Sequence, residues 1–291
     1  MSICRPLYLL GVALLCYCSA LVQAKERVEW IATQSSPFEV AVQQQRDQGP
    51  AEQLRQLLIH ALPQYQHGAL QRVDATALES LFERGNTCHA TLSRTAYTER
   101  ARYLSVAVGF AHARVVLTTP EIYRRLAQPR EVSLTQLLSD TWLRMGVVSH
   151  ALSPQLRAIV KREAYQPNIL YRNTLENDRG LVDMLHRKQI DYFVGYPAQA
   201  MYWNKLYPDK PLIAVPLKEV AVRYLTGHVT CSRSDLGREV VEKVNQILLE
   251  EREKPEYAAR FVFEWMPRAM KKDYLRHYFV SMPSAVWTNV N

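Results

Sequence analysis

The chain has 291 residues, of which 48% are hydrophobic and 22% charged, and its formal net charge is +8. This composition argues against a disordered chain and is sufficient for one large or two intermediate domains with apolar cores. The Lys and Arg residues are scattered along the chain. We therefore interpret the positive charge as a basic solvated surface, open to weak attraction for anionic ligands or envelope surfaces, and not as a nucleic-acid site.

The first 24 residues have the pattern of a secretory signal peptide. Arg5 precedes an apolar run over residues 7–15, and small residues lead to a cleavage site after Ala24. The run is too short to span a bilayer. The alternative is a lipoprotein signal, which requires a small residue before the lipidated cysteine, and neither Cys16 nor Cys18 follows one. We therefore expect a monomeric protein in the periplasm.

Two cysteines, Cys88 and Cys231, follow the expected cleavage site. In an oxidising compartment, an even pair far apart in sequence favours a disulfide over two free thiols. No His/Cys spacing near either residue indicates a metal site. A catalytic cysteine is the alternative, but neither sequence context offers a nearby base in a recognisable motif.

The first third of the chain alternates strands and helices. Residues 28–33 form a β-rich run that ends at a Ser-Ser-Pro turn, and apolar residues recur at helical spacing from Pro50 to Leu62. A strand at 69–73, a helix at 75–84 and a strand at 87–92 follow. This β-α-β-α-β order predicts a parallel sheet covered by helices.

The middle of the chain repeats this order, which predicts a second α/β unit. No low-complexity linker separates the two units, so we expect strands to join them. The expected strands are 115–118, 144–148, 168–171, 190–194, 212–215 and 224–231, and the expected helices are 134–139, 154–162, 179–187 and 235–251.

The segment GNTCHATLSRTAYTERARYLS, residues 85–105, resembles the type 2 periplasmic solute-binding proteins of the amino-acid-binding group, family 3. In that family a G-x-x-D-A strand leads to a T-x-x-x-x-R segment and an aromatic-Ser pair. Three further stretches resemble the family in the expected order. They are the Ser-Pro-Phe turn at 36–38, LVDMLHRKQID at 181–191 and the closing region 232–267. Each motif is weak, and the ordered set over nearly the whole mature chain carries the resemblance.

The resemblance implies a two-lobed α/β fold of the type 2 periplasmic-binding-protein kind. Each lobe would be a five-stranded mixed sheet flanked by helices, and two crossing strands would join the lobes around a ligand cleft. Lobe 1 would comprise residues 25–117 and 226–291, and lobe 2 residues 118–225. The family sheet also places strand 227–232 antiparallel beside strand 87–92, so the resemblance predicts a disulfide between Cys88 and Cys231.

The same resemblance assigns ligand contacts to Phe38, Thr95, Arg100 and Tyr196. Arg100 matches the arginine that grips a carboxylate through two parallel charge-assisted hydrogen bonds. Thr95, five residues earlier, matches a position that faces the ligand, and Phe38 offers an aromatic face at the border of the cleft. The alternatives are a surface cation for Arg100 and core packing for Phe38.

Two positions depart from the family pattern. Tyr196 stands where amino-acid binders usually have the aspartate that pairs with the ligand ammonium. His150 replaces a glycine before a helix whose first amides can hold an anion, and it is either a ligand contact or a surface residue. A standard α-amino acid is therefore disfavoured, and a carboxylated or otherwise anionic ligand, or no ligand, is favoured.

The sequence thus predicts a periplasmic receptor that delivers a small solute to an ABC permease. The alternative is a non-transport homologue that serves as a sensor partner or envelope interaction protein. We expect no enzyme, metal or cofactor. The histidines show no metal-ligand spacing, there is no phosphate loop or G-x-S-x-G elbow, and Glu39, Tyr196 and His150 are only scattered acid-base candidates.

Overall fold

The computed structural model describes residues 25–33, 36–39, 49–74, 77–93, 102–148, 152–162, 167–172, 177–261 and 266–282. The expected signal peptide and the residues Thr95, Arg100 and His150 lie outside this part of the chain. No helix in these ranges is both long enough and apolar enough to cross a membrane.

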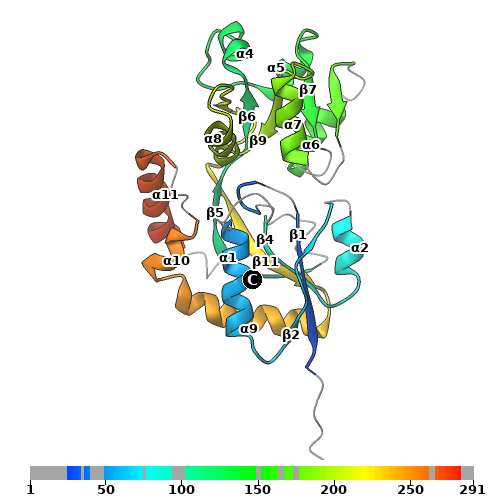
Figure 1. Ribbon diagram of the computed structural model, residues 1–291, viewed down its shortest axis with the longest axis vertical. Helices are drawn as coiled ribbons and strands as arrows, with labels where there is room; N and C mark the ends of the chain where they lie inside the picture. Colours follow the sequence, from blue (N-terminus) through cyan, green and yellow to red (C-terminus); the bar gives the residue numbers. More distant parts are fainter. Residues whose placement is uncertain are drawn as a thin grey trace, which may run out of the picture.

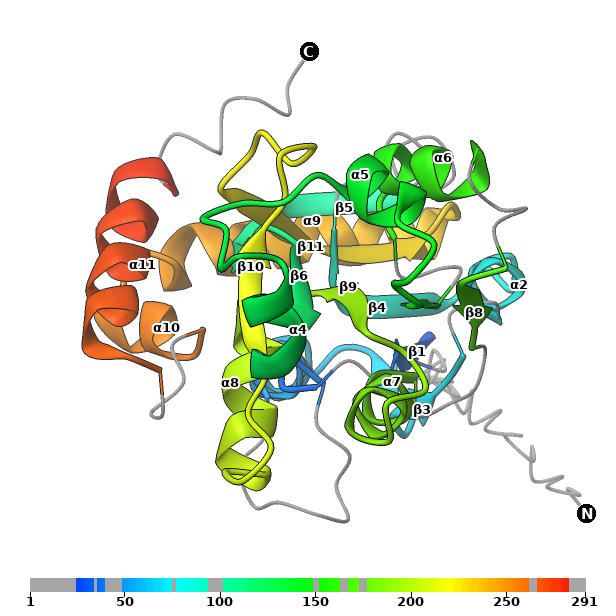
Figure 2. The ribbon, with the colours of Figure 1, turned by 90° about the horizontal axis from the view of Figure 1, so that it is seen from above.

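Two α/β lobes lie one above the other along the longest axis of the molecule (Figure 1), and Figure 2 shows them from above. The first sheet has the order β2-β1-β4-β11-β5, with β3 also paired to β1. Its strands are β1 (Arg27–Ala32), β2 (Gln66–His67), β3 (Gln71–Arg72), β4 (Thr87–Ser93), β5 (Arg102–His112) and β11 (Tyr224–Ser232). The helices of this lobe are α1 (Pro50–Ala61), α2 (Leu78–Phe82), α9 (Asp235–Glu251), α10 (Pro255–Ala259) and α11 (Arg268–Ser281).

The second sheet has the order β10-β6-β9-β7-β8. Its strands are β6 (Val115–Thr118), β7 (Met145–Val147), β8 (Ile169–Tyr171), β9 (Tyr192–Gly195) and β10 (Ile213–Pro216). The helices around it are α4 (Pro120–Arg125), α5 (Leu134–Ser139), α6 (Pro154–Arg162), α7 (Asn177–His186) and α8 (Pro197–Leu206). Two mixed sheets, flanked by helices, therefore give the two-lobed α/β fold that the sequence predicts.

The chain passes between the sheets twice. It leaves the first sheet after β5 and enters the second at β6, and it returns between β10 and β11. All four residues of β6 pair with β9 and β10, although the expected boundary between residues 117 and 118 would divide this strand. The sheets place the first crossing at residues 113–114. The residue limits of the lobes otherwise stay a prediction.

Successive residues of the central strands in the second lobe enter different apolar clusters. Val116 and Val194 join one cluster, whereas Leu117 and Phe193 join another. Because side chains alternate across a strand, the two clusters occupy opposite faces of the sheet. Helices cover both faces, which explains why these strands read as continuous apolar runs.

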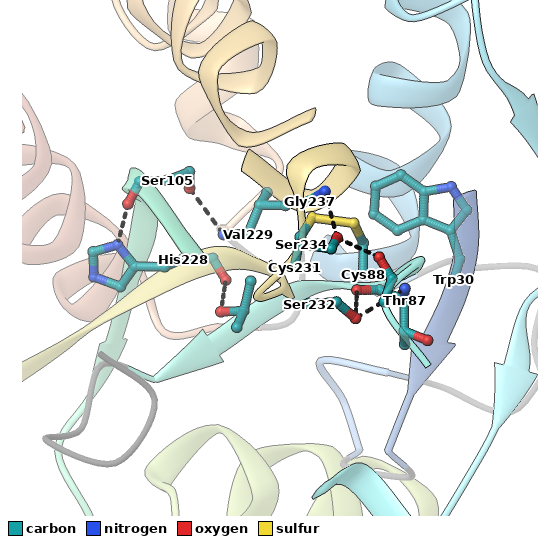
Figure 3. The surroundings of a disulfide bond; sticks show 12 residues. Trp30, Thr87, Cys88, Ser105, His228, Val229, Cys231, Ser232, Ser234 and Gly237 are labelled. Atoms are coloured by element: carbon teal, nitrogen blue, oxygen red, sulfur yellow. Dashed lines mark hydrogen bonds between the residues drawn. A yellow bond between two sulfur atoms is a disulfide. The ribbon is translucent and has the colours of Figure 1, made fainter. Parts of the chain in front are cut away.

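The disulfide predicted from the family resemblance is present between β4 and β11 (Figure 3). Cys88 is paired directly with Cys231 in the antiparallel register, and their Cα atoms are 4.1 Å apart. The two residues are 2% and 0% exposed. The bond therefore lies inside the core of the first lobe and joins segments separated by 143 residues.

A β-bulge interrupts β11 close to the disulfide. The register shifts between His228 and Thr230 against both neighbouring strands. The hydroxyl of Ser105 accepts a hydrogen bond from the backbone N–H of Val229 at 2.9 Å (Figure 3), so this buried donor has a partner at the bulge.

The sequence interpretation did not identify β5, α4, α8 or the C-terminal helix α11. Helix α11 buries only Tyr274 and Tyr278, four residues apart. The Tyr274 hydroxyl accepts from Phe110 N–H at 3.2 Å, and the Tyr278 hydroxyl donates to Arg252 C=O at 3.0 Å. Such a narrow stripe of tyrosines, each with a polar end, has little of the aliphatic periodicity that identifies a packed helix.

Removal of the disulfide should destabilise the first lobe. We expect the variant with both Cys88→Ala and Cys231→Ala to lose about 2–5 kcal/mol of unfolding free energy, because the bond restricts the unfolded chain over a long loop. Urea denaturation measures this loss. Reductant should lower the unfolding free energy of the native protein, because unfolding exposes the buried disulfide to reduction. The same treatment should leave the unfolding free energy of the variant unchanged. Equal stability of the two proteins would contradict a structural role for the bond.

Candidate functional site

The structure brings two of the four predicted ligand residues together. Phe38 lies in the turn at residues 36–39, which follows β1 of the first lobe, and Tyr196 directly follows β9 of the second. Their ring centroids are 5.5 Å apart and the rings meet edge to face at 78°. Thr95 and Arg100 lie outside the described residues, so their assignment as ligand contacts stays a prediction.

The turn that carries Phe38 is fixed to the start of helix α1. The N–H of Ala51 donates to the C=O of Phe38 at 3.3 Å. Gly49 lies so close to the turn that an added Cβ would be 2.2 Å from the Phe38 carbonyl oxygen and 2.5 Å from that of Pro37. The close approach of turn and helix thus depends on a residue without a side chain.

Glu39 holds the end of the same turn against the first sheet. The Thr33 hydroxyl donates to Glu39 Oε2 at 2.8 Å, and His89 Nε2 lies 3.0 Å from Glu39 Oε1. Glu39 is 5% exposed and His89 1%. His89 Nδ1 accepts from Thr91 N–H at 3.1 Å, so in a neutral His89 the proton is on Nε2, the nitrogen that lies beside the carboxylate. Glu39 and His89 therefore have a positioning role for the Phe38 turn.

Tyr196 is fixed on the opposite lobe by the first turn of α8. Its N–H donates to Gln199 Oε1 at 2.7 Å, and its C=O accepts from Gln199 N–H at 2.9 Å. The guanidinium of Arg114, in the first crossing between the lobes, lies 4.6 Å from the centroid of the Tyr196 ring. This distance is within the range of a cation-π interaction. The Tyr196 ring thus contacts both the Arg114 guanidinium and the Phe38 ring.

Asp178 adds a polar contact between the same two lobes. It lies in the first turn of α7, and its Oδ2 accepts the backbone N–H of Ser36 at 3.0 Å. The Gln199 side chain also forms a hydrogen bond with Asp178. Burial raises the pKa of the Asp178 carboxyl to about 7, against the lowering effects of the Gln199 and Ser36 hydrogen bonds and of the Arg114 charge.

Sequence reasoning did not identify Asp178, Arg114 or Gln199 as parts of this site. Asp178 lies in the polar first turn of α7 and resembles any acidic residue at a helix start. Gln199 could have been recognised from the sequence, because the side chain of a glutamine two residues after Pro197 can accept a hydrogen bond from the backbone N–H at the start of the helix.

A pocket within the first lobe is lined in part by Glu39. Its charged groups are Glu39, Glu52, Arg55 and Arg72. Arg55 Nε donates to Glu52 Oε2 at 2.8 Å, and Arg72 Nη1 donates to Glu39 C=O at 3.4 Å. The charges of this pocket are thus engaged with groups of the protein itself. In the described ranges, no group of three or more His, Cys, Asp or Glu residues could hold a metal ion.

Comparison with solved structures agrees with this architecture. An ancestral arginine-binding protein bound to arginine matches with a TM-score of 0.65 and 14% identity, over 84% of this chain and 99% of that chain. The substrate binding protein of an amino acid ABC transporter matches at 0.60 and 14%, over 82% and 99%. An ancestral amino acid-binding protein described as a precursor of cyclohexadienyl dehydratase matches at 0.59 and 14%, over 82% and 94%.

No protein-family model matches the sequence, and the search of curated proteins finds no relative. The structural matches cover most of this chain and nearly all of each matched chain, although the sequence identities are low. The chain therefore has the two-lobed fold of the type 2 periplasmic solute-binding proteins.

The tight contact at Gly49 can be tested directly. Gly49→Ala should cost about 1–3 kcal/mol of unfolding free energy, because its Cβ overlaps carbonyl oxygens of the Phe38 turn and one of the two segments must move. Thermal or urea unfolding measures the loss. Gly227→Ala is the matched control, since an added Cβ there has its nearest atom at 3.5 Å. A loss for Gly227→Ala as large as that for Gly49→Ala would contradict the explanation.

Proposed function

We propose that the chain is an exported solute-binding protein that captures a small carboxylated or otherwise anionic ligand between its lobes. Its partner would be the inner-membrane permease of an ABC importer. The observation that carries this proposal is the pair of Phe38 and Tyr196, which meet from opposite lobes. Each follows the carboxyl end of a parallel strand, the edge of an α/β sheet where ligands bind.

The ligand contacts follow from this placement together with the family resemblance. Phe38 and Tyr196 supply aromatic surface, and Arg100 with Thr95 supplies the recognition of a carboxylate. Two of the matched structures are described as binding proteins of amino acids or of an amino acid transporter, which supports a binding role in preference to catalysis. Tyr196 supplies no charge for a ligand ammonium, and this favours an anionic ligand over a standard α-amino acid.

A second candidate function is a signalling or envelope interaction role without transport. The observation that favours it is the direct contact between the lobes through Phe38, Tyr196, Ser36 and Asp178. A partner could then recognise the arrangement of the lobes themselves. In this case small solutes would leave the thermal stability unchanged.

A thermal-shift screen over carboxylates, small anions, amino acids and polyamines tests the binding role. A ligand that binds only the folded protein, present at a concentration of about 100 times its Kd, adds about 2.7 kcal/mol to the unfolding free energy. We expect a carboxylated hit, and Arg100→Ala should weaken its affinity by about 30-fold or more, because a buried charge-assisted pair is broken.

Arg84→Ala is the matched control for this experiment. Arg84 is exposed and follows α2 in the same lobe, so its loss should leave the ligand-induced shift unchanged. A tight carboxylated hit that is indifferent to Arg100→Ala would show that the cleft residues are wrongly assigned. Absence of any hit across the screen would contradict solute binding and favour the second candidate.

A further inference from the structure

Two of the contacts between the turn at residues 36–39 and the second lobe carry the inference. The first is the hydrogen bond from Ser36 N–H to Asp178 Oδ2, at 3.0 Å. The second is the edge-to-face packing of Phe38 on Tyr196. Asp178 and Tyr196 come from different elements, α7 and the start of α8, so the turn contacts the second lobe at two separate places. We refer to Ser36, Phe38, Asp178 and Tyr196 as the interlobe latch.

We propose that the interlobe latch holds the two lobes together without help from a ligand, and that raising the pH releases it. The latch would regulate the proposed binding cleft. It rests on the proposed function in one respect, which is that the lobes must be able to separate. Ligand access would then depend on pH as well as on ligand concentration.

The polar half of the latch is coupled to the aromatic half through one side chain. Gln199 accepts the N–H of Tyr196 at 2.7 Å and also hydrogen-bonds to Asp178. Tyr202, on the next turn of α8, forms a side-chain hydrogen bond with Ser36. A displacement of the turn would therefore disturb Asp178 and α8 together.

Charged and polar groups from three elements face Asp178. Arg114 in the first crossing attracts the ionised carboxylate, Glu39 of the turn repels it, and Gln199 and Ser36 donate hydrogen bonds to it. On α7 itself, Arg179 and Asp183 pair with each other at 4.0 Å, with side chains 42% and 41% exposed. Burial outweighs the favourable contacts, and the pKa of Asp178 rises to about 7.

The direction of the pH effect follows from this raised pKa. Separation of the lobes would return Asp178 to water, where its pKa falls back toward 3.8. Closing therefore takes up a proton between about pH 4 and pH 7, and the joined state is favoured below this window. Within the window, each unit of pH increase shifts the equilibrium toward separated lobes by up to about tenfold.

Distance measurements between spin labels on the two lobes test the latch in ligand-free protein. Labels attached at Gln136→Cys on α5 and Glu242→Cys on α9 report one lobe each, because both positions are exposed. We expect one short distance at pH 5 and a growing population of longer distances up to pH 8. Asp178→Asn should keep the short distance at both pH values, since the amide stays neutral.

Asp183→Asn is the matched control, because it makes the same chemical change on the same helix outside the latch. It should keep the native pH response. Tyr196→Ala should increase the long-distance population at every pH, whereas Tyr196→Phe should leave the distances native because the ring remains. These two variants test the latch independently even where Asp178→Asn lowers the yield of folded protein.

The proposal is overturned if the native distance does not change between pH 5 and pH 8, or if Asp178→Asn changes with pH as the native protein does. It is also overturned if Tyr196→Ala leaves the distances unchanged. The ligand screen fails or succeeds separately from these results. A pH-dependent distance with no ligand hit supports the latch and contradicts solute capture, and a ligand hit with a pH-independent distance does the reverse.

Discussion

The return of β11 into the first sheet is the constraint on which the rest of the structure depends. β11 pairs with both β4 and β5, and the buried bond from Cys231 to Cys88 fixes its register against β4. The second lobe, from β6 to β10, lies in the sequence between β5 and β11. It is therefore an insertion, and the first sheet holds both of its ends. The crossings are therefore short and leave and re-enter the first lobe side by side.

This arrangement brings together the two sides of the candidate site. The crossings bring the 36–39 turn, at the end of β1, to Tyr196, at the end of β9, although 158 residues separate Phe38 from Tyr196. The turn is held to its own lobe by Gly49, Ala51 and the pair of Glu39 and His89. A turn held in place on one lobe and a helix start on the other thus form the two sides of the candidate site.

Much of the fold could be predicted from the sequence, because local patterns determine it. β6, α5, α6 and α9 have the predicted limits, and each is a short apolar strand or a helix with clear ends. The count of two cysteines after the expected cleavage site favoured a Cys88–Cys231 bond, and the resemblance to a known family predicted which strands it joins. Asp178 could not be predicted as part of the site, since its role depends on Ser36, 142 residues away. Helix α11 escaped prediction because tyrosines with polar ends form its buried stripe.

The charges at the candidate site bear on the proposal that the ligand is anionic. In the described part of the chain, Asp178 and Glu39 are the carboxylates that the structure places beside the Phe38 turn, and both already accept hydrogen bonds from the protein. A ligand ammonium would therefore have to share these carboxylates with donors of the protein itself. The guanidinium of Arg114, by contrast, contacts the face of Tyr196, so positive charge remains available at the site. Tyr196, at the position where the family resemblance implies a carboxylate, offers no negative charge to a cation, and its ring contacts Phe38 of the other lobe.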